Sequence, residues 1–350
     1  MNGSEASSKI TTKTIARLAN VSRGTVDRAL NNRPGVNEKT KQRILEIARS
    51  LDYKPNVIGQ RLSKSARQIT IGVILPNYAF YQEILRGIQE TKDVYQQFGI
   101  TFEIIIHDIY SVNTQLEDIR SLEERGIYGL IISPLVGPSL TDKIDGLTER
   151  GVPVVTLNSD LPGSNRLCYV GQDNYRSGWT SAELIGKLLR PGEPVVICTP
   201  KIDVQVHQLR VSHFTTFLEQ YHPAIPIAKV LRMDVDPQSD FQSLKELFHA
   251  FPGLGGLYFT FTAHDDIHRA LREHRKNHPL HVITHDDLPE SRAALMEGLL
   301  DFIITQNPTE QGALATKLLC EHLLYRLVPE HEYNYMAPLI QCRASFIAEL

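Results

Sequence analysis

Aromatic, amide and carboxylate side chains follow the apolar runs that recur along the chain after residue 68. Aromatic faces stack on the C–H surfaces of a sugar ring, while amides and carboxylates hydrogen-bond its hydroxyl groups. Each of these side chains taken alone is explained at least as well by a helix cap or another structural role, but their shared position favours a binding site for a polyhydroxylated ligand. The candidates are Asn77, Phe80, Tyr81, Asn158, Ser159, Thr262, His264, Asp265, His285, Asp286, Asp287 and Gln306.

Histidines are concentrated between residues 264 and 285, where acidic residues are also frequent. His264 and His268 are four residues apart, a spacing that lets two imidazoles on one helix bind a metal ion. No glutamate follows the first histidine as it does in zinc hydrolases, and no serine or cysteine has the sequence context of a nucleophile. We therefore expect no metal, no cofactor and no catalytic residues, and a metal-dependent enzyme is the weaker alternative.

The apolar runs alternate with stretches of helical periodicity, which is the pattern of parallel sheets flanked by helices. The runs that predict strands are residues 69–75, 102–106, 129–132, 152–157, 195–198, 227–231, 256–259, 282–284 and 302–305. They are more than one such sheet normally needs, and a segment rich in Ser, Asn, Gly and Pro at residues 158–165 indicates two lobes. Ligands of open parallel sheets bind beyond the carboxyl ends of the strands, where the candidate side chains fall.

The first sixty residues predict three short helices. Ile15, Leu18 and Ala19 have helical spacing, and after a tight turn Ser22 can cap a second helix. Two short helices joined in this way form a helix-turn-helix. Asn37 can cap a third helix that completes a small core. The apolar residues expected on the second and third helices are Val26, Ala29, Leu30, Ile44, Ile47, Ala48 and Leu51.

Charge is segregated between this head and the rest of the chain. Residues 1–67 hold 14 Lys and Arg against 5 Asp and Glu, whereas the remaining residues hold 23 against 35. A basic head suits DNA, because neutralising phosphates and releasing counterions supplies most of the sequence-independent affinity. The overall net charge of −3 therefore conceals a basic, DNA-binding head on an acidic body.

The head resembles the lactose-repressor family of bacterial transcription regulators in specific motifs. They are Ala19-Asn20-Val21-Ser22, Thr25-Val26-Asp27-Arg28-Ala29-Leu30-Asn31, Val36, Thr40 and Tyr53-Lys54-Pro55-Asn56. By that resemblance Thr25 steadies the backbone, and the positions that face the major groove are Arg23, Gly24, Asp27 and Arg28. The residues expected to contact DNA are Thr12, Lys13, Ser22, Arg23, Gly24, Thr25, Asp27, Arg28, Asn31, Asn56 and Leu62.

Asp27 departs from this family, which usually has serine there. A carboxylate near DNA is repelled by phosphates unless it is paired. Arg23 lies four residues earlier on the same helical face, so an Arg23–Asp27 pair would aim the guanidinium at a guanine edge. Acceptance of a hydrogen bond from a cytosine amino group by Asp27 is the alternative.

Residues 55–68 are interpreted as a hinge helix followed by a linker. The helical part, residues 56–62, is too short to be stable alone in water, and Gly59 lowers its stability by about 1 kcal/mol relative to alanine. We expect it to be disordered in the free protein. By the family resemblance it pairs with its copy in a dimer and inserts Leu62 into the minor groove, where apolar wedges kink DNA.

The order of the later elements resembles the type I periplasmic sugar-binding fold, in which the chain crosses between two lobes three times. Gln306-Asn307-Pro308 followed by Glu310-Gln311-Gly312 is similar to the last crossing of ribose-type binding proteins. The resemblance implies that Phe80 and Tyr81 sandwich the sugar ring. It also implies that Asp286 and Gln306 bind hydroxyls, and that Arg210, on the helix after the fifth predicted strand, binds a hydroxyl or carboxylate. The implied effector-binding residues are Asn77, Phe80, Tyr81, Asn158, Arg210, His264, Asp286 and Gln306.

Two positions depart from the sugar-binding pattern. Asn158-Ser159 replaces the common Asp-Arg pair, which removes a charged clamp on the sugar. His264 replaces an asparagine, which adds a titratable group. The aromatic pair would suit a nucleobase as well as a sugar, so a purine-like corepressor is an alternative effector.

The predicted architecture is a small all-α helix-turn-helix head followed by a two-lobed α/β domain of parallel sheets flanked by helices. Its segments are a DNA-binding domain at residues 1–54, a hinge and linker at 55–68, and an effector-binding and dimerisation domain at 69–350. Within the last, lobe 1 is expected at about residues 69–165 and 307–330, and lobe 2 at about 166–306 and 331–350.

The predicted function is a bacterial, sequence-specific transcriptional repressor controlled by a carbohydrate-like effector. Its expected partners are double-stranded operator DNA, the effector and a second copy of the chain, as a homodimer or a higher oligomer. The sequence has no run of 18 apolar residues and no signal-peptide pattern, so we expect a cytoplasmic protein that does not act at a membrane.

Overall fold

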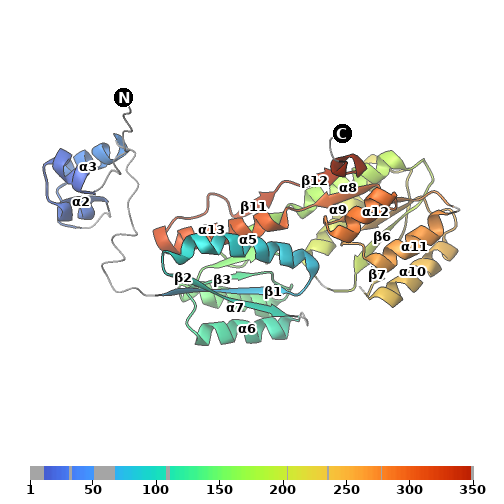
Figure 1. The fold of residues 1–350 in the computed structure, drawn as a ribbon, viewed down its shortest axis with the longest axis horizontal. Helices are drawn as coiled ribbons and strands as arrows, with labels where there is room; N and C mark the ends of the chain where they lie inside the picture. Colours follow the sequence, from blue (N-terminus) through green and yellow to red (C-terminus); the bar gives the residue numbers. More distant parts are fainter. Residues whose placement is uncertain are drawn as a thin grey trace, which may run out of the picture. The chain divides into compact units, whose positions relative to one another are not determined.

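The computed structural model describes residues 12–30, 34–50, 68–107, 111–202, 204–234, 236–276 and 278–347. The chain forms two compact units, Met1–Arg67 and Gln68–Leu350, each with its own core (Figure 1). No helix in the described part of the chain combines the length and the apolarity needed to span a bilayer.

The first unit holds the three helices predicted for the head, which are α1 (Thr12–Ala19), α2 (Arg23–Leu30) and α3 (Glu38–Ser50). The turn between α1 and α2 passes through Asn20, whose φ is 51°. Ser22 Oγ accepts the backbone N–H of Thr25 at 3.1 Å, which confirms the predicted cap of α2. Asn37 Oδ1 likewise accepts the backbone N–H of Thr40 at 2.8 Å, which confirms the cap of α3.

The head core is made of small and branched apolar side chains from all three helices. Its buried members are Ile15, Ala16, Ala19, Val26, Ala29, Ile44 and Ala48. Leu18, predicted for the buried face of α1, is instead 47% exposed. Ala16 takes its place, because Ile15, Ala16 and Ala19 together form the narrow face that meets α2 and α3. The core therefore holds α2 against both of its neighbours.

The first lobe of the second unit is a parallel six-stranded sheet with helices on both faces (Figure 1). In spatial order its strands are β11 (Tyr333–Met336), β5 (Cys168–Gln172), β4 (Val154–Leu157), β3 (Gly129–Ile132), β1 (Ile69–Pro76) and β2 (Ile100–His107). The helices of one face are α5 (Ala79–Gln96) and α13 (Pro308–Tyr325), and those of the other are α6 (Val112–Glu124) and α7 (Pro138–Glu149). The inner strands are buried along most of their length, as strands covered on both faces must be.

The second lobe repeats this design. In spatial order its strands are β12 (Leu339–Gln341), β10 (Phe302–Thr305), β9 (His281–His285), β8 (Gly256–Phe259), β6 (Val195–Pro200) and β7 (Ile227–Met233). The helices of one face are α8 (Asn174–Leu188) and α9 (Gln205–Tyr221), and those of the other are α10 (Pro237–Ala250), α11 (Asp265–Arg275) and α12 (Pro289–Glu297). Strand β12 is antiparallel to β10, and a short 3-10 helix, η1 (Arg343–Phe346), follows it.

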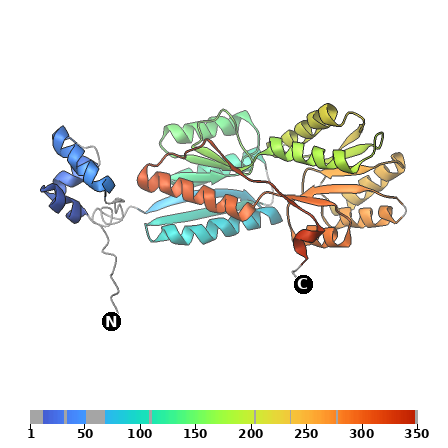
Figure 2. The same ribbon diagram turned by 90° about the horizontal axis from the view of Figure 1, so that it is seen from above.

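Three connections join the lobes, as the resemblance to sugar-binding proteins implied (Figure 2). The chain passes from β5 to α8, from β10 to α13 and from β11 to β12. The carboxyl ends of the central strands of both sheets therefore lie near the place where the lobes meet.

The predicted lobe boundaries are wrong at two strands. Strand β5 pairs with β4 and β11 pairs with β5, so both belong to lobe 1 and not to lobe 2. The polar segment at residues 158–165 is a loop inside lobe 1. It is held there by Arg166, whose Nε lies 2.6 Å from Oδ1 of Asp160 and whose other end reaches Glu332 at 2.9 Å. A buried ion pair, rather than a change of lobe, explains this polar composition.

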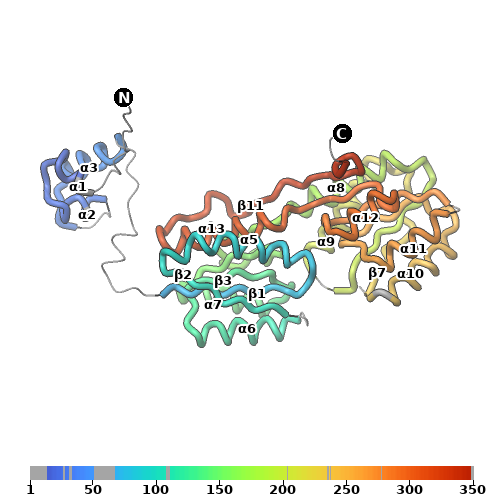
Figure 3. The backbone as a smooth tube through the Cα atoms, viewed as in Figure 1, coloured from blue at the N-terminus to red at the C-terminus, as the bar shows by residue number. Residues whose placement is uncertain are grey.

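Helices α5 and α13 lie side by side along the same face of lobe 1 (Figure 3). Two glycines allow this close approach. A Cβ on Gly312 would collide with the backbone oxygen of Ile84, and one on Gly87 with that of Thr309. Because α13 follows the second crossing, this packing also fixes where the chain re-enters lobe 1.

We expect Gly312→Ala to lower the free energy of unfolding by about 1 to 3 kcal/mol, because the added methyl group must push α5 and α13 apart. Gly253→Ala is the matched control, since a Cβ at Gly253 meets nothing within 4 Å, and it should change stability by less than about 0.5 kcal/mol. Chemical denaturation of the three proteins measures both effects. Equal stabilities for the two variants would contradict the packing argument.

Candidate functional site

Six of the eight predicted effector-binding residues lie together where the lobes meet. They are Phe80, Tyr81, Asn158, Arg210, Asp286 and Gln306, and all of them are buried. Phe80 and Tyr81 begin α5 of lobe 1, and Asn158 directly follows β4. The other three come from α9 and from the ends of β9 and β10 in lobe 2. Strand ends of both sheets thus supply three of the six residues, and helices α5 and α9 supply the other three.

Tyr81 anchors the lobe 1 side of this inter-lobe cluster. Its Oη lies 2.8 Å from Ser133 Oγ and accepts a hydrogen bond of 2.8 Å from Asn158 Nδ2. Burial raises the pKa of the Tyr81 hydroxyl, so it stays a neutral donor and acceptor. The Phe80 and Tyr81 rings are 5.3 Å apart at 90°. Adjacent residues on one helix cannot present parallel faces here, so this edge contact differs from the predicted sandwich around a sugar ring.

Arg210 is the central charge on the lobe 2 side and is only 1% exposed. It donates to the Thr260 carbonyl at 2.7 Å and to Gln172 Oε1 at 3.1 Å, both neutral oxygens. Burial lowers the pKa of Arg210, and nearby Tyr258 and Asp286 oppose that change. The guanidinium remains a cation, and its Nε has no hydrogen-bond partner among the described residues.

Asp286 faces Arg210 as the buried acid of the cluster. Its Oδ1 accepts from Gln306 Nε2 at 2.6 Å, and its Oδ2 accepts from Thr262 Oγ1 at 3.1 Å. Burial raises the pKa of Asp286, and the positive charge of Arg210 is the largest of the effects that oppose this rise. Asp286 has a φ of 68° and Asn158 one of 62°, a left-handed conformation that side chains rarely adopt. Such local strain is concentrated at binding sites.

Several polar atoms in and beside this cluster are buried without a hydrogen-bond partner. They are Asn158 Oδ1, Arg210 Nε, His285 Nδ1, Thr305 Oγ1 and Gln306 Oε1. Buried polar groups in folded proteins are nearly always paired, so a group of unpaired donors and acceptors is the chemical complement of a small polar ligand. Lobe 1 supplies the first of these atoms and lobe 2 the others, so such a ligand would touch both lobes.

Two predicted residues lie elsewhere. His264 Nε2 is 3.0 Å from Oδ2 of Asp240, a fully buried carboxylate on α10, so its imidazole faces a neighbouring helix. Asn77 is exposed and accepts a hydrogen bond from Gln82 Nε2 at 3.1 Å. Both residues follow a strand, but their side chains contact other side chains of the protein, which is the structural alternative to ligand binding, and His264 makes no cap hydrogen bond to α11.

Gln172 was missed because its short strand, β5, was not predicted. Its Nε2 donates to the Thr305 carbonyl at 3.1 Å, and its Oε1 accepts from Arg210. Gln172 itself precedes the first crossing and Thr305 precedes the second, so this amide links the starts of two of the three crossings. Ser133 and Thr260 were also missed. Each directly follows a predicted strand, so its position at a strand end is the signal that could have identified it.

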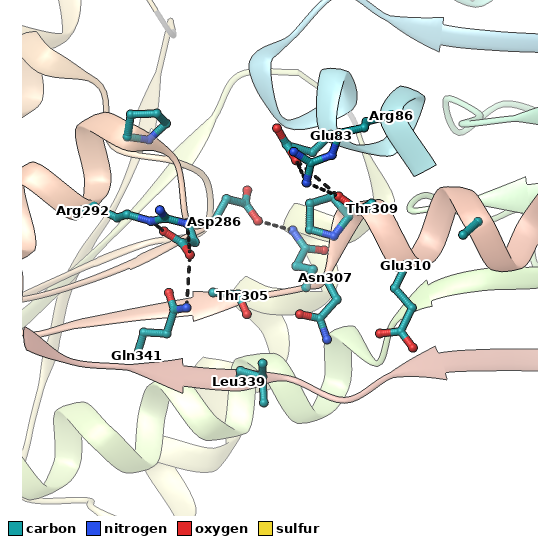
Figure 4. A pocket seen from close by; sticks show the side chains of 15 residues that line it. Glu83, Arg86, Asp286, Arg292, Thr305, Asn307, Thr309, Glu310, Leu339 and Gln341 are labelled. Carbon is teal, nitrogen blue, oxygen red and sulfur yellow. Dashed lines mark hydrogen bonds and ion pairs between the residues drawn. The ribbon is translucent and has the colours of Figure 1, made fainter. Parts of the chain in front are cut away.

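A cavity of about 700 Å³ opens beside the cluster and includes Asp286 and Gln306 in its wall (Figure 4). Of the other candidates from the sequence, Asp287 also lines it, whereas the remaining six implied effector-binding residues do not. The buried cluster carries the chemistry of the candidate effector site, because it holds the buried side chains of Arg210 and Asp286 and most of the unpaired polar atoms. Access to Arg210 and Tyr81 then requires the lobes to separate.

Within the described residues, no group of three or more His, Cys, Asp or Glu side chains is arranged to hold a metal ion. His264 is engaged by Asp240, and His268 is buried on α11 with Nδ1 3.8 Å from Oδ1 of the exposed Asp265. Burial lowers the pKa of His268 to about 4. The two histidines at helical spacing thus have separate structural surroundings.

In the head, the described candidates lie on or beside α2. Arg23 and Arg28 are exposed, and Thr25 Oγ1 lies 2.9 Å from Ser22 Oγ, next to Gly24. Thr12, Lys13 and Asp27 belong to α1 and α2, but their side chains are outside the described part, and with them the predicted Arg23–Asp27 pair. Also outside the described residues are Asn31, Asn56, Gly59, Leu62 and the predicted hinge up to residue 67.

Two family models match the chain. Residues 71–326 match the model described as periplasmic binding protein domain. Residues 11–56 match the model described as bacterial regulatory proteins, lacI family. The two matches correspond to the two structural units.

Curated relatives include the HTH-type transcriptional regulator RegA of Clostridium acetobutylicum, 32% identical over 50% of this chain and 51% of the relative. The probable HTH-type transcriptional repressor ExuR of Bacillus subtilis is 28% identical over 68% of this chain and 69% of the relative. The ribose operon repressor of Bacillus subtilis is 28% identical over 88% of this chain and 90% of the relative. The chain spans about half the length of the RegA proteins it matches.

Solved structures share the fold. A putative LacI transcriptional regulator from Bacteroides fragilis superposes with a TM-score of 0.73 at 24% identity, over 80% of this chain and 98% of that one. A solute-binding protein of an ABC transporter from Burkholderia graminis, in complex with D-arabinose, gives a TM-score of 0.74 at 24% identity, over 82% of this chain and 99% of that one. At this identity the likeness shows the two-lobed fold alone.

His285 lies fully buried next to the cluster, with its Nε2 3.0 Å from Oη of Tyr258. Burial holds the pKa of its imidazole well below the ordinary value, and the Arg210 cation adds to the effect. His285 is therefore neutral in the folded protein, whereas in the unfolded chain it takes up a proton below about pH 6.5.

We therefore expect the free energy of unfolding to fall as the pH drops below about 6.5, with a contribution from His285 of up to about 1.4 kcal/mol per pH unit. The His285→Gln protein should lack this part of the slope. Denaturation between about pH 6.5 and 5 measures it before most carboxylates titrate. His331→Gln, which replaces an exposed histidine, is the matched control. Parallel profiles for wild type and His285→Gln would refute the assignment.

Proposed function

The chain belongs to the periplasmic binding protein domain family and carries an N-terminal helix-turn-helix of the lacI family, and from this premise we propose that it is a sequence-specific transcriptional repressor. It binds operator DNA as a homodimer, and a small carbohydrate-like effector controls its operator affinity. The observation that carries the proposal is the buried cluster of hydrogen-bonding side chains supplied by both lobes.

The head recognises the base sequence of the operator. Arg23 and Arg28 are exposed on α2, and the core holds that helix between α1 and α3. Arginine reaches the acceptor atoms of guanine in the major groove, whereas the basic surface around it attracts phosphates of any sequence. In this proposal residues 1–54 bind DNA, 55–68 form the hinge, and 69–350 bind the effector and dimerise.

The effector binds where the lobes meet. Asn158 Oδ1 of lobe 1 and Arg210 Nε of lobe 2 are unpaired in the same buried region, and a polyhydroxylated molecule offers both donors and acceptors to them. A ligand shifts a conformational equilibrium only through different affinities for its states, and contact with both lobes supplies that difference. The name of the ribose operon repressor, similar over 88% of this chain, supports a sugar as the effector.

This role needs binding and conformational change but no bond chemistry, and we infer that the protein is a regulator and not an enzyme. The thiols of Cys168 and Cys198 are buried, and burial raises the pKa of Cys168 to about 12. Thiols held in this way remain protonated and are poor nucleophiles.

We expect Arg28→Ala to weaken binding to the cognate operator by about 1 to 3 kcal/mol and to have much less effect on random DNA, because only base contacts discriminate between sequences. Arg43→Ala removes an equally exposed charge from α3 and serves as the control. It should weaken binding to both DNAs alike. Titration of labelled duplexes at fixed salt measures this. Equal losses on both DNAs for Arg28→Ala would rule out its base-reading role.

Asp286→Asn removes the buried charge while keeping a residue that tolerates the left-handed backbone at this position. We expect it to abolish the response to the effector and to leave effector-free operator affinity nearly unchanged. Asp265→Asn, which removes a 90%-exposed carboxylate after the neighbouring strand β8, should behave like wild type. Calorimetry with pentoses, hexoses, sugar acids and nucleobases identifies the effector first. Full effector affinity in Asp286→Asn would show that the site lies elsewhere.

A further inference from the structure

Leu135, Val204 and Val206 form a small apolar cluster that joins the two lobes. Leu135 lies between β3 and α7 of lobe 1, whereas Val204 and Val206 lie at the start of α9 in lobe 2. The three side chains are 6%, 8% and 4% exposed, and the partly buried Val112 and Ile202 pack against them. Among the apolar clusters of the described residues, this one alone combines side chains of both lobes.

The order of the strands places the apolar cluster away from the crossings, with the buried polar cluster around Arg210 between them. In lobe 1 the crossing strands β11 and β5 are followed by β4, at whose end Asn158 lies, and by β3, which leads to Leu135. In lobe 2 the crossing strands β12 and β10 are followed by β9, at whose end Asp286 lies, then by β8 and by β6, which leads to Val204. We call the side of the apolar cluster the mouth, because all three crossings lie at the opposite side.

On lobe 1, the loop that carries Leu135 is held by the side chain of Gln115, which is 1% exposed. Gln115 Oε1 accepts the backbone N–H of Leu135 at 3.0 Å, and its Nε2 donates to the Ser133 carbonyl at 2.8 Å. Ser133 Oγ in turn lies 2.8 Å from Oη of Tyr81. A displacement of Tyr81 therefore reaches the loop of Leu135 through one hydrogen bond.

On lobe 2, Val206 and Arg210 lie one helical turn apart on α9, and both are buried. Arg210 donates to the Thr260 carbonyl at 2.7 Å, and Nδ1 of His207 lies 3.1 Å from the same oxygen. The start of α9 is thus fixed to the same loop as Arg210. Each half of the apolar cluster is therefore attached to a member of the polar cluster.

The two clusters respond differently when the lobes separate. Exposing a leucine or valine side chain to water is unfavourable in proportion to the apolar area, and no hydrogen bond offsets that loss. Polar side chains can replace hydrogen bonds within the protein by hydrogen bonds to water. The apolar cluster therefore favours the closed arrangement whether or not a ligand is bound.

We propose that Leu135, Val204 and Val206 form an apolar clasp, which holds the lobes together at the mouth before an effector binds and must open to admit it. The clasp forms again after binding, because closure brings the same three side chains together. Closure of the lobes by the clasp is independent of any effector, whereas its control of effector entry rests on the proposed function.

Distances between spin labels test the clasp in the effector-free protein. The labels are attached to Ser139→Cys and Gln208→Cys, exposed positions four residues beyond Leu135 and Val204. Cys342→Ser removes the one native cysteine that is not buried. Double electron–electron resonance should give a single short distance, and Val204→Asp should shift most molecules to a longer one, because closure would bury an unpaired carboxylate. An unchanged distribution in Val204→Asp, or a long distance with the clasp intact, overturns the proposal.

Leu135→Ala and Leu161→Ala separate the clasp from a general loss of stability. Both remove a buried leucine of lobe 1, but Leu161 lies in the core of that lobe and is 4% exposed. We expect both variants to have lower melting temperatures, and only Leu135→Ala to raise the ratio of open to closed molecules, by about tenfold. Equal opening in Leu161→Ala would attribute the effect to stability and overturn the proposal.

A molecule from the calorimetric panel above that binds to the wild type supplies a second measurement. In Leu135→Ala its association and dissociation rates should both rise about tenfold while its dissociation constant stays within about threefold, because the clasp is closed before and after binding. Unchanged rates would overturn the role of the clasp in entry. A panel without any binder contradicts the proposed function, while the spin-label distances still decide on the clasp.

Discussion

The buried guanidinium of Arg210 is the interaction on which the arrangement of the second unit depends. A cation with 1% exposure is costly unless its donors are satisfied. The Thr260 carbonyl and the Gln172 amide oxygen meet two of its nitrogens, and Asp286 supplies an opposite charge nearby. Thr260 follows β8 and Asp286 follows β9, so both belong to lobe 2 like Arg210 itself, whereas Gln172 ends β5 of lobe 1. One of the two hydrogen bonds of the buried charge therefore crosses between the lobes.

Gln172 connects the buried Arg210 to two of the crossings between the lobes. It ends β5 just before the chain leaves lobe 1, and its amide also donates to the carbonyl of Thr305, just before the chain returns. A ligand that pairs with the free Nε of Arg210 therefore acts on a side chain that already holds two crossings together. Lobe 1 begins with β1, directly after the predicted hinge, so a change at the crossings is linked through the chain to the DNA-binding head.

Local sequence predicted the features that depend on near neighbours. The caps by Ser22 and Asn37 involve residues three positions away, and the alternation of strands and helices is a pattern along the chain. Features that depend on distant pairing were not predictable in this way. Strand β5 joins lobe 1 because it pairs with β4, and Arg166, besides its neighbour Asp160, also binds Glu332, which is 166 residues away along the chain. His264 follows a strand, yet its partner Asp240 lies on another helix, so strand position alone misassigned its surroundings.

In the proposed regulator, one molecule bound between the lobes controls operator affinity. This is tested by the dissociation constant of the identified effector with and without saturating operator, together with that of the operator with and without saturating effector. We expect the two ratios to depart from one and to equal each other, because linkage makes the coupling reciprocal. Effector binding at the same affinity in the presence and absence of operator would contradict it.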